Sequence, residues 1–389
     1  MYRLASDLHL RKRLPIGMIG GGAGSFFAPF HRAAMRLSGR WDLKAGAFSS
    51  EATKSSAAGE ALGVEAARIY SNVHALVASE RRRSDGVRAV AVVTPNHLHF
   101  EACHALLEAG IGVICDKPLV NGLEEARTLR SMARDRGTFF GMTYTYCGFP
   151  MVREARTRAL AGDIGDIRFA YAEYLQEWLA DKPEHLGAKA GAWRTDPTKA
   201  GPTGTLGDVG THAFNLLEFV TGKTVAQVSA TMLTTVPGRK LDDCDVVQLR
   251  FDGGFAGLIW ATQAAPGHRN GLRFKIVGSE GSLEWRQEAP ETLQIGRLGQ
   301  ADTILHRGQR EMTRQGAGEV TLPAGNPEGY LEALAVLYTD FADALDPANG
   351  SATSSYPHPG VEEGFRGVSL CECALDSSRD DGAWVSLPT

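Results

Sequence analysis

The stretch Ile16-Gly17-Met18-Ile19-Gly20-Gly21-Gly22-Ala23-Gly24-Ser25 places an apolar segment directly before a run of glycines. Apolar spacing typical of a helix follows over residues 26–37. In a strand–turn–helix unit, Gly20 would permit the tight turn and Gly22 would let backbone N–H groups approach a pyrophosphate at the helix N-terminus. Ser25 stands at the third position of the pattern, where a small residue allows close packing of helix on strand. The stretch therefore predicts a dinucleotide-binding turn, and the alternative is a glycine-rich loop without a ligand.

Outward from this turn, short apolar runs alternate with longer amphipathic segments through the first third of the chain. Such alternation is typical of a parallel sheet with helices on both faces. We expect further strands over 43–48, 89–94, 112–115 and 139–144, and helices over 52–62, 98–109 and 123–136. Residues 1–145 are thus predicted to form a doubly wound α/β domain.

Beyond residue 145 the apolar residues recur with a period of two, and glycine-containing turns separate the runs. This pattern predicts an α+β domain over 146–389 with a large open, mostly antiparallel sheet. The expected strands are 167–174, 225–234, 247–251, 255–262, 272–276 and 282–285. No structure is predicted over 296–316. Helices are expected over 328–345 and 361–377, and these could pack back on either domain.

Length and composition limit the classes of protein that need to be considered. The chain has 389 residues, which favours two to three domains, because single cores stop growing near ~250–300 residues. The net charge of -4 argues against a nucleic-acid partner. No run approaches the ~18 apolar residues of a membrane span, and the N-terminus lacks the apolar core of an export signal. The six cysteines are thinly spread, so we expect a reducing, cytoplasmic setting.

The end of the second expected strand bears on the choice of nucleotide. It reads Ala47-Phe48-Ser49-Ser50, with no acidic residue to accept from a ribose 2′-hydroxyl, and Asp42 lies at the wrong end of the strand. Ser49 and Ser50 could donate to phosphate oxygens with charge added by Lys54, which slightly favours NADP over NAD. The alternative is that the two serines only cap the following helix.

Three further motifs follow in order: Thr94-Pro95-Asn96-His97-Leu98-His99, Cys115-Asp116-Lys117-Pro118-Leu119 and Gly204-Thr205-Leu206-Gly207-Asp208-Val209-Gly210-Thr211-His212. In this order and spacing they resemble the signatures of the Gfo/Idh/MocA family, the glucose-fructose oxidoreductase and inositol dehydrogenase group. The resemblance extends through nearly the whole chain. It implies an N-terminal Rossmann domain, a C-terminal α/β domain, and NAD(P)-dependent oxidation or reduction of sugars and cyclitols in a crevice between the two. It also implies a homodimer or homotetramer formed through the C-terminal sheet.

Lys117 follows an apolar strand, so we expect it at the carboxyl edge of the parallel sheet, where open α/β folds bind ligands. Beside a cationic nicotinamide its ammonium form would be disfavoured, which suits a proton shuttle. Asp116, where the family usually has Glu, is expected to orient Lys117. The alternative is that Lys117 forms a surface salt bridge.

Asp208 and His212 are four residues apart at what the sequence predicts to be a helix start. On a helix this spacing places both side chains on one face, close enough to share a proton or to bind adjacent hydroxyls. The resemblance implies that both are catalytic together with Lys117. The alternative for Asp208 is a helix N-cap. The family commonly has Asp three residues after the His, where this chain has Asn215.

The resulting hypothesis is that Lys117, Asp208 and His212 remove the hydroxyl proton of a ring alcohol while the nicotinamide accepts the hydride. Expected cofactor contacts come from Gly20, Gly22, Ala23, Gly24, Ser25, Ser49, Ser50, Thr94, Pro95, Asn96, His99, Asp116 and Lys117. Expected substrate contacts come from Tyr144, Tyr146, Trp193, Arg194, Asp208 and His212. No metal is expected, because His97, His99, Glu101 and His104 do not converge on one helix face. Two alternatives remain, a catalytically silent nucleotide sensor and a reductase acting on an imine.

Overall fold

The computed structural model describes residues 12–181, 195–347 and 356–389. The chain divides into two compact units. The N-terminal unit comprises the described residues of Leu4–Thr145 and Tyr330–Phe365. The C-terminal unit comprises those of Tyr146–Gly329 and Arg366–Thr389. The two units are described separately below.

A five-stranded parallel sheet forms the centre of the N-terminal unit, as the sequence predicted. Its order is β2-β1-β3-β4-β5, so the winding direction reverses between β1 and β3, and ligands bind open α/β sheets at such a switch point. Every residue of β3 and β4 is buried, which explains why both read as continuous apolar runs. The strands are β1 (Leu14–Ile19), β2 (Trp41–Ala47), β3 (Ala89–Val92), β4 (Gly112–Cys115) and β5 (Phe140–Met142).

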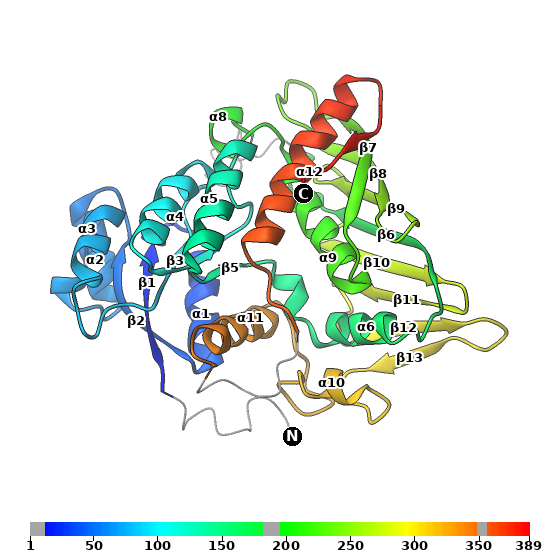
Figure 1. Cartoon of the computed structure of the whole chain (residues 1–389), viewed down its shortest axis with the longest axis horizontal. Coiled ribbons are helices and arrows are strands. Elements are labelled where there is room, and N and C mark those ends of the chain that lie inside the picture. Colours follow the sequence, from blue (N-terminus) through cyan, green and yellow to red (C-terminus); the bar gives the residue numbers. More distant parts are fainter. Residues whose placement is uncertain (1–11, 182–194, 348–355) are drawn as a thin grey trace. The chain divides into compact units, whose positions relative to one another are not determined.

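Helices surround this sheet, and α11 packs against α1 although about 300 residues separate them in the sequence (Figure 1). Helix α3 was missed in the sequence analysis, where the segment shows no strong amphipathic period; the Asn72 side chain caps it by accepting from the Ala75 N–H at 2.9 Å. The helices are α1 (Ala28–Ser38), α2 (Ala52–Ala61), α3 (Val73–Glu80), α4 (His99–Glu108), α5 (Leu123–Arg136) and α11 (Tyr330–Leu345), with short 3₁₀ turns η2 (Ala66–Arg68) and η3 (Asn96–Leu98).

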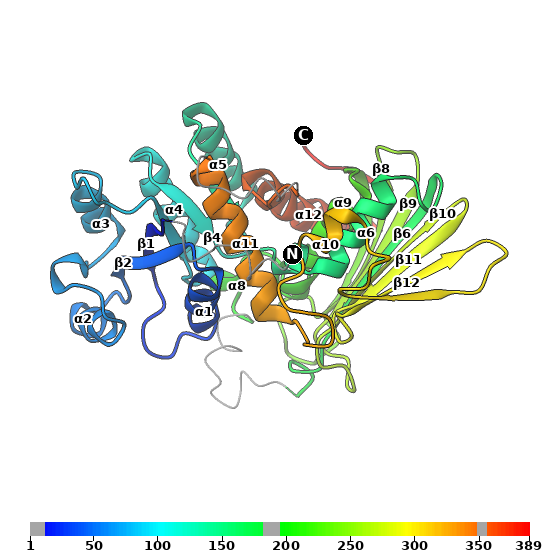
Figure 2. The same cartoon turned by 90° about the horizontal axis from the view of Figure 1, so that it is seen from below.

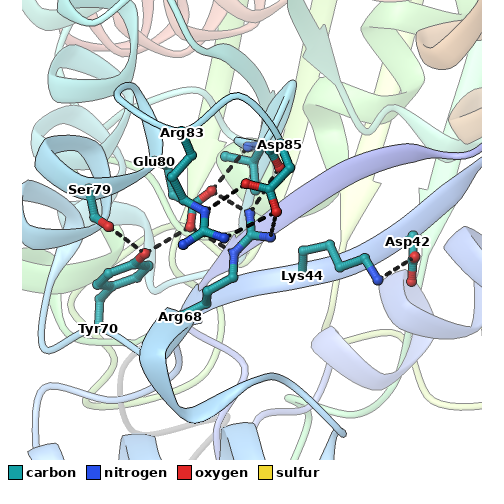
Figure 3. Close-up of polar contacts among 9 residues, drawn as sticks. Asp42, Lys44, Arg68, Tyr70, Ser79, Glu80, Arg83 and Asp85 are labelled. Atoms are coloured by element: carbon teal, nitrogen blue, oxygen red, sulfur yellow. Dashed lines mark hydrogen bonds and ion pairs between the residues drawn. The ribbon is translucent and has the colours of Figure 1, made fainter.

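A buried ion pair fixes the chain that follows α2 (Figure 3). The Arg68 Nε donates to Glu80 Oε1 at 3.0 Å, and the two side chains are 4% and 0% exposed. The Tyr70 hydroxyl donates to the same carboxylate at 2.8 Å, while the Tyr70 N–H donates to the Gly46 carbonyl at 2.8 Å. This network ties α3 to the last residues of β2, directly before Ser49.

The C-terminal unit contains a nine-stranded sheet in the order β13-β12-β11-β10-β6-β9-β8-β7-β14, in which only the β6–β9 pair is parallel. The prediction of a large, mostly antiparallel sheet is confirmed. Strand β13 and the end of β12 lie where the sequence predicted no structure, because the pairing of β12 with β11 and of β13 with β12 imposes strands on a weakly patterned segment. The strands are β6 (Ile167–Leu175), β7 (Val225–Leu233), β8 (Cys244–Phe251), β9 (Ala256–Thr262), β10 (Gly271–Gly278), β11 (Gly281–Arg286), β12 (Thr292–Arg297), β13 (Thr303–His306) and β14 (Val385–Ser386).

Helices α6 (Pro150–Leu160) and α9 (Thr211–Thr221) cover one face of this sheet (Figure 2). The period-two pattern of β10 shows the consequence, since Leu272, Phe274 and Ile276 are at most 1% exposed beneath these helices. Within the described residues of this unit, no helix covers the opposite face. The remaining elements are η4 (Thr145–Gly148), α8 (Pro197–Ala200), η6 (Leu206–Gly210), α10 (Arg314–Ala317) and α12 (Val361–Arg379). None of the described helices has the length and apolar character needed to cross a membrane.

Candidate active site

The glycine turn after β1 lies at the switch point of the parallel sheet. Gly20 has a φ of +86°, which favours glycine, and a Cβ there would lie 3.0 Å from the Val93 carbonyl oxygen in the loop after β3. A Cβ on Gly22 would lie 2.6 Å from the Phe48 carbonyl oxygen, to which the Gly22 N–H donates at 2.9 Å. Only glycine lets this cradle approach the chain that follows β2 and β3 so closely, and such a tight glycine turn fits the expected dinucleotide cofactor.

The helix after the turn begins later than the sequence predicted. Helix α1 starts at Ala28, with Phe27 at the N-cap position, so Ala23, Gly24 and Ser25 belong to the turn. The Ser25 N–H donates to the Gly22 carbonyl at 3.1 Å. Ser25 therefore closes the turn and lies outside the helix.

Ser49 and Ser50 follow the end of β2, close to the glycine turn. The N-cap residue of α2 is Glu51 and makes no side-chain cap bond, so the alternative that either serine is the cap of α2 is wrong. The Ser49 hydroxyl accepts from the Glu51 N–H at 3.2 Å, and Lys54 forms an ion pair with Glu51. Asp42 lies at the other end of β2 and pairs with Lys44 at 2.8 Å (Figure 3).

His99 is fully buried beneath the Thr94-Pro95-Asn96 loop. Its two ring nitrogens lie 2.9 Å from the carbonyl oxygens of Thr94 and Pro118, so the ring links the loop after β3 to the loop after β4. Burial lowers the pKa of His99, an effect that the nearby Asp116 carboxylate opposes. His99 therefore holds two loops of the candidate site together, and its contact with a cofactor stays a prediction.

Asp116 and Lys117 directly follow β4. Asp116 Oδ1 accepts from the Lys117 N–H at 3.0 Å and from the Thr143 hydroxyl at 2.7 Å. Burial by itself raises the pKa of Asp116, but His31, Lys117 and Thr143 outweigh it and hold this pKa well below its usual range. Asp116 is therefore a carboxylate at neutral pH. It fixes the backbone of Lys117, whose side chain is half-buried.

In the C-terminal unit, Asp208 lies in the π-helical turn η6 and His212 lies in the first turn of α9. The expectation of one regular helix start is therefore wrong in detail, because a wider turn precedes α9. The N-cap of α9 is Gly210, so the alternative that Asp208 caps this helix is also wrong. The wide turn is anchored by Asp242, whose carboxylate accepts from the Leu206 N–H at 2.9 Å.

A glutamine that sequence reasoning missed holds Asp208. Gln263 Nε2 donates to Asp208 Oδ2 at 2.9 Å, and Gln263 Oε1 accepts from the Thr205 hydroxyl at 3.2 Å. Gln263 is 1% exposed. It follows β9 in the register of the buried Ile259 and Ala261, so a polar residue at an inward-facing position was the signal that could have identified it.

Tyr146 lies against His212 within the same unit. The two rings are perpendicular, at 89°, with centroids 5.0 Å apart. The Tyr146 hydroxyl shares a hydrogen bond with the Tyr174 hydroxyl, which in turn donates to Asn270 Oδ1 at 2.7 Å. Burial raises the pKa of Tyr146, with the Asp208 charge adding to the effect, so its phenol keeps its proton.

The other predicted substrate contacts are placed differently. Tyr144 is 1% exposed and belongs to the N-terminal unit, whereas Tyr146 belongs to the C-terminal unit. Trp193 and Arg194 lie outside the described residues. Asn215 is 4% exposed, and its Oδ1 accepts from the Cys147 thiol at 3.0 Å. In the part of the chain that the structure describes, no group of three or more His, Cys, Asp or Glu side chains is arranged to hold a metal ion.

The N-terminal unit has a glycine cradle at the switch point of a parallel sheet, and the second unit carries an acid and an imidazole. This combination is typical of dinucleotide-dependent oxidoreductases. Residues 14–144 match the family described as "Oxidoreductase family, NAD-binding Rossmann fold", and residues 152–284 match the "GFO/IDH/MocA C-terminal domain". The chain belongs to the Gfo/Idh/MocA family of oxidoreductases, which confirms the resemblance and the fold class predicted from the sequence.

Three similar proteins illustrate this membership. Oxidoreductase YfiI of Bacillus subtilis (strain 168), described as uncharacterized, is 33% identical over 97% of this chain and 98% of its own length. Levoglucosan dehydrogenase of Pseudarthrobacter phenanthrenivorans is 30% identical over 78% of this chain and 80% of its own. The crystal structure of an inositol dehydrogenase homolog from Azotobacter vinelandii, complexed with NADH and myo-inositol, has a TM-score of 0.88 and 32% identity, and the match covers 99% of both chains.

Proposed function

We propose that this protein is an NAD(P)-dependent dehydrogenase that interconverts a ring hydroxyl and a ketone on a sugar, sugar derivative or cyclitol. The observation that carries the proposal is the cluster of the half-buried Asp208 with the buried His212 and Tyr146, in which an acid, an imidazole and a phenol lie beside amide side chains that bind hydroxyl groups well. The relatives named above support this substrate class, since one is a levoglucosan dehydrogenase and another was crystallised with myo-inositol.

The cofactor would be held by the glycine cradle from Gly20 to Ser25 and by the loops that follow β2, β3 and β4. When bound, the nicotinamide supplies the hydride acceptor or donor that no side chain can provide. We further propose a slight preference for NADP over NAD. In support, no acidic residue occupies Ala47–Ser50 at the end of β2, and the Ser49 hydroxyl accepts from the Glu51 N–H, which leaves its own hydrogen for a phosphate oxygen.

The protein's own part is to bind the substrate and move one proton. Lys117 accepts the proton of the substrate hydroxyl during oxidation, while the ionised Asp116 fixes the backbone at Lys117. Asp208 accepts a hydrogen bond from Gln263, which orients its carboxylate so that it can also accept from a substrate hydroxyl. His212 completes the set of three groups that act on the reacting hydroxyl. Positioned acid–base groups are typically worth ~10²–10⁴ in rate.

We also propose that the uncovered face of the nine-stranded sheet forms the contact between subunits of a homodimer or homotetramer. Apolar side chains gather on this face. Trp260 of β9 pairs in register with Val246 of β8, and the two residues are 37% and 39% exposed. Phe169 of β6 is 37% exposed on the same face. Exposed apolar side chains in one patch commonly mark a protein interface.

An absorbance screen of reduced nicotinamide tests the proposed function. The purified protein is incubated with NAD⁺ or NADP⁺ and a panel of inositols, anhydrosugars and pyranoses, and Lys117→Ala is compared with Lys44→Ala as a matched control. We expect turnover by the wild type and by Lys44→Ala, and a loss of ~10²–10⁴-fold in Lys117→Ala. Tight nucleotide binding without turnover on any compound would support the sensor instead, and consumption of NAD(P)H with an imine alone would support the imine reductase.

A further inference from the structure

We infer that His31 is a positioning residue that fixes the Asp116 carboxylate and, through it, Lys117. The inference deepens the proposed function and rests on it. His31 lies on α1, twelve residues from the end of β1, and sequence analysis gave it no role. It is 2% exposed, so its polar ring requires partners within the protein.

The ring of His31 lies between two polar groups of the N-terminal unit. Its Nδ1 is 2.9 Å from the Tyr338 hydroxyl of α11. Its Nε2 is 3.8 Å from Asp116 Oδ2. The His31 and Asp116 side chains are 3% and 20% exposed, so solvent screens this contact little on the His31 side.

The second carboxylate oxygen is the one that His31 controls. Asp116 Oδ1 already accepts from the Lys117 N–H and the Thr143 hydroxyl, which leaves Oδ2 to face the imidazole. The imidazole faces Oδ2 at ion-pair distance, so it favours this orientation of the carboxylate. Its charge therefore acts on Lys117 from a fixed position.

Tyr338 selects the tautomer of His31. A carboxylate can only accept, so the ring nitrogen that faces it must carry hydrogen, and in a neutral imidazole the other nitrogen is then an acceptor. Burial raises the pKa of Tyr338, and the nearby Asp116 charge raises it further, so the phenol keeps its hydrogen and donates to Nδ1. Hydrogen bonds to one ring nitrogen commonly set the state of the other in this way.

The support behind Tyr338 is rigid. The Trp41 indole N–H donates to the Tyr338 carbonyl at 2.7 Å, and Tyr338 itself is fully buried. Helix α11 packs along α1, so the elements that carry His31 and Tyr338 are held against each other. Without His31, Oδ2 would be free to turn and bring its charge closer to the Lys117 ammonium, which stabilises the protonated form and leaves less of the neutral amine that can accept a proton.

Kinetics of the variants test this role. We expect His31→Leu to lower kcat about tenfold, with the KM of the substrate and the Kd of NADH within twofold of wild type, because the buried His31 offers almost no surface to either ligand. His31→Gln should recover part of the loss, since its amide N–H can replace the donor. Ser38→Ala is the control, because Ser38 is a buried polar residue of the same helix whose hydroxyl donates to the Met35 carbonyl and accepts from the Arg40 N–H.

A double-mutant cycle separates positioning from packing. In an Asp116→Asn background, His31→Leu should have no further effect on kcat, because the group through which it acts is gone. Additive losses, or full kcat in a folded His31→Leu protein, would overturn the inference.

A measurement without turnover keeps this test independent of the proposed function. Lys117 is acetylated with acetic anhydride and its rate is followed by mass spectrometry relative to Lys44 in the same sample. We expect the ratio to fall at least threefold in His31→Leu and to stay unchanged in Ser38→Ala. If this ratio falls in His31→Leu although the protein oxidises no substrate, the positioning role of His31 stands and the proposed dehydrogenase activity is rejected. If the ratio is unchanged in a folded and active His31→Leu protein, the positioning role of His31 is rejected and the dehydrogenase activity stands.

Discussion

Gln263 Nε2 lies 2.9 Å from Asp208 Oδ2 and donates to it, across 55 residues of sequence. The orientation of the amide is fixed at its other end, because Gln263 Oε1 accepts from the Thr205 hydroxyl. A carboxylate that accepts from a buried amide is held in one orientation. Asp208 is thus prepared as a hydrogen-bond acceptor before any substrate arrives.

Replacing the Gln263 amide, which donates to Asp208, by a carboxylate should impair activity. Gln263→Glu replaces an N–H donor by a second carboxylate beside Asp208, so we expect kcat to fall ~10–100-fold and the acid limb of the pH–rate profile to move to higher pH, because like charges bind a proton more tightly. Gln300→Glu, on the exposed turn after β12, is the matched control and should leave both quantities unchanged. Equal profiles for Gln263→Glu and wild type would show that the amide does not set the state of Asp208.

Gly22→Ala should weaken nucleotide binding. The added Cβ would lie 2.6 Å from the Phe48 carbonyl oxygen, which is backbone and cannot move away without displacing the end of β2. Overpacking of this kind typically costs ~1–3 kcal/mol. We expect a lower Tm and a weaker NADH affinity by fluorescence quenching. Gly122→Ala is the control, since a Cβ there meets nothing within 4 Å; if both variants bind NADH like the wild type, the cradle is not the nucleotide site.

Glu80→Ala should destabilise the N-terminal unit. It leaves the Arg68 guanidinium buried without its carboxylate, and breaking a buried pair in this way typically costs ~3–5 kcal/mol. Urea unfolding measures the loss. Asp85→Ala removes a partner of the same arginine that is 61% exposed, so its midpoint should stay close to that of the wild type. Similar urea midpoints for Glu80→Ala and Asp85→Ala would show that the buried partner of Arg68 stabilises the unit no more than the exposed one.

Asp245→Asn should stabilise the protein in a pH-dependent way. Asp245 is fully buried, and burial together with the Asp242 charge raises its pKa well above the usual value. An acid with a raised folded pKa loses stability as pH rises above its unfolded pKa of ~3.9, at up to about 1.4 kcal/mol per pH unit. The gain from the neutral amide should therefore be small near pH 4 and larger at pH 7 in urea unfolding. Asp302→Asn, on an exposed turn, should show no such trend.

Trp260→Glu should dissociate the proposed oligomer. The substitution places a charge in the middle of the exposed apolar patch, directly beside Glu173 in the sheet register, and charged residues are depleted at interface cores. Sedimentation velocity at micromolar concentration should show a smaller species for Trp260→Glu than for wild type. A wild-type protein that sediments as a monomer would reject the interface.

Much of the fold could be predicted because its signals are local. The glycine turn, the buried strands β3 and β4 and the alternation of β10 each follow from a short window of sequence. Prediction failed where the window carried little signal. Helix α3 depends on the Asn72 cap and on the Glu80–Arg68 pair, and β13 depends on pairing with β12.

The candidate site divides in the same way. The sequence by itself determined which ionisable groups the chain offers, because Asp116-Lys117 must follow a parallel strand and Asp208 and His212 are only four residues apart. Only the tertiary structure decided how each group is held. His31 contacts Tyr338 across 307 residues of sequence, and Gln263 contacts Asp208 across 55. The fold also buries His99 between two loops. The physical reason is that sheet register and helix packing, which bring distant side chains within hydrogen-bond distance, are properties of the whole fold rather than of any local pattern.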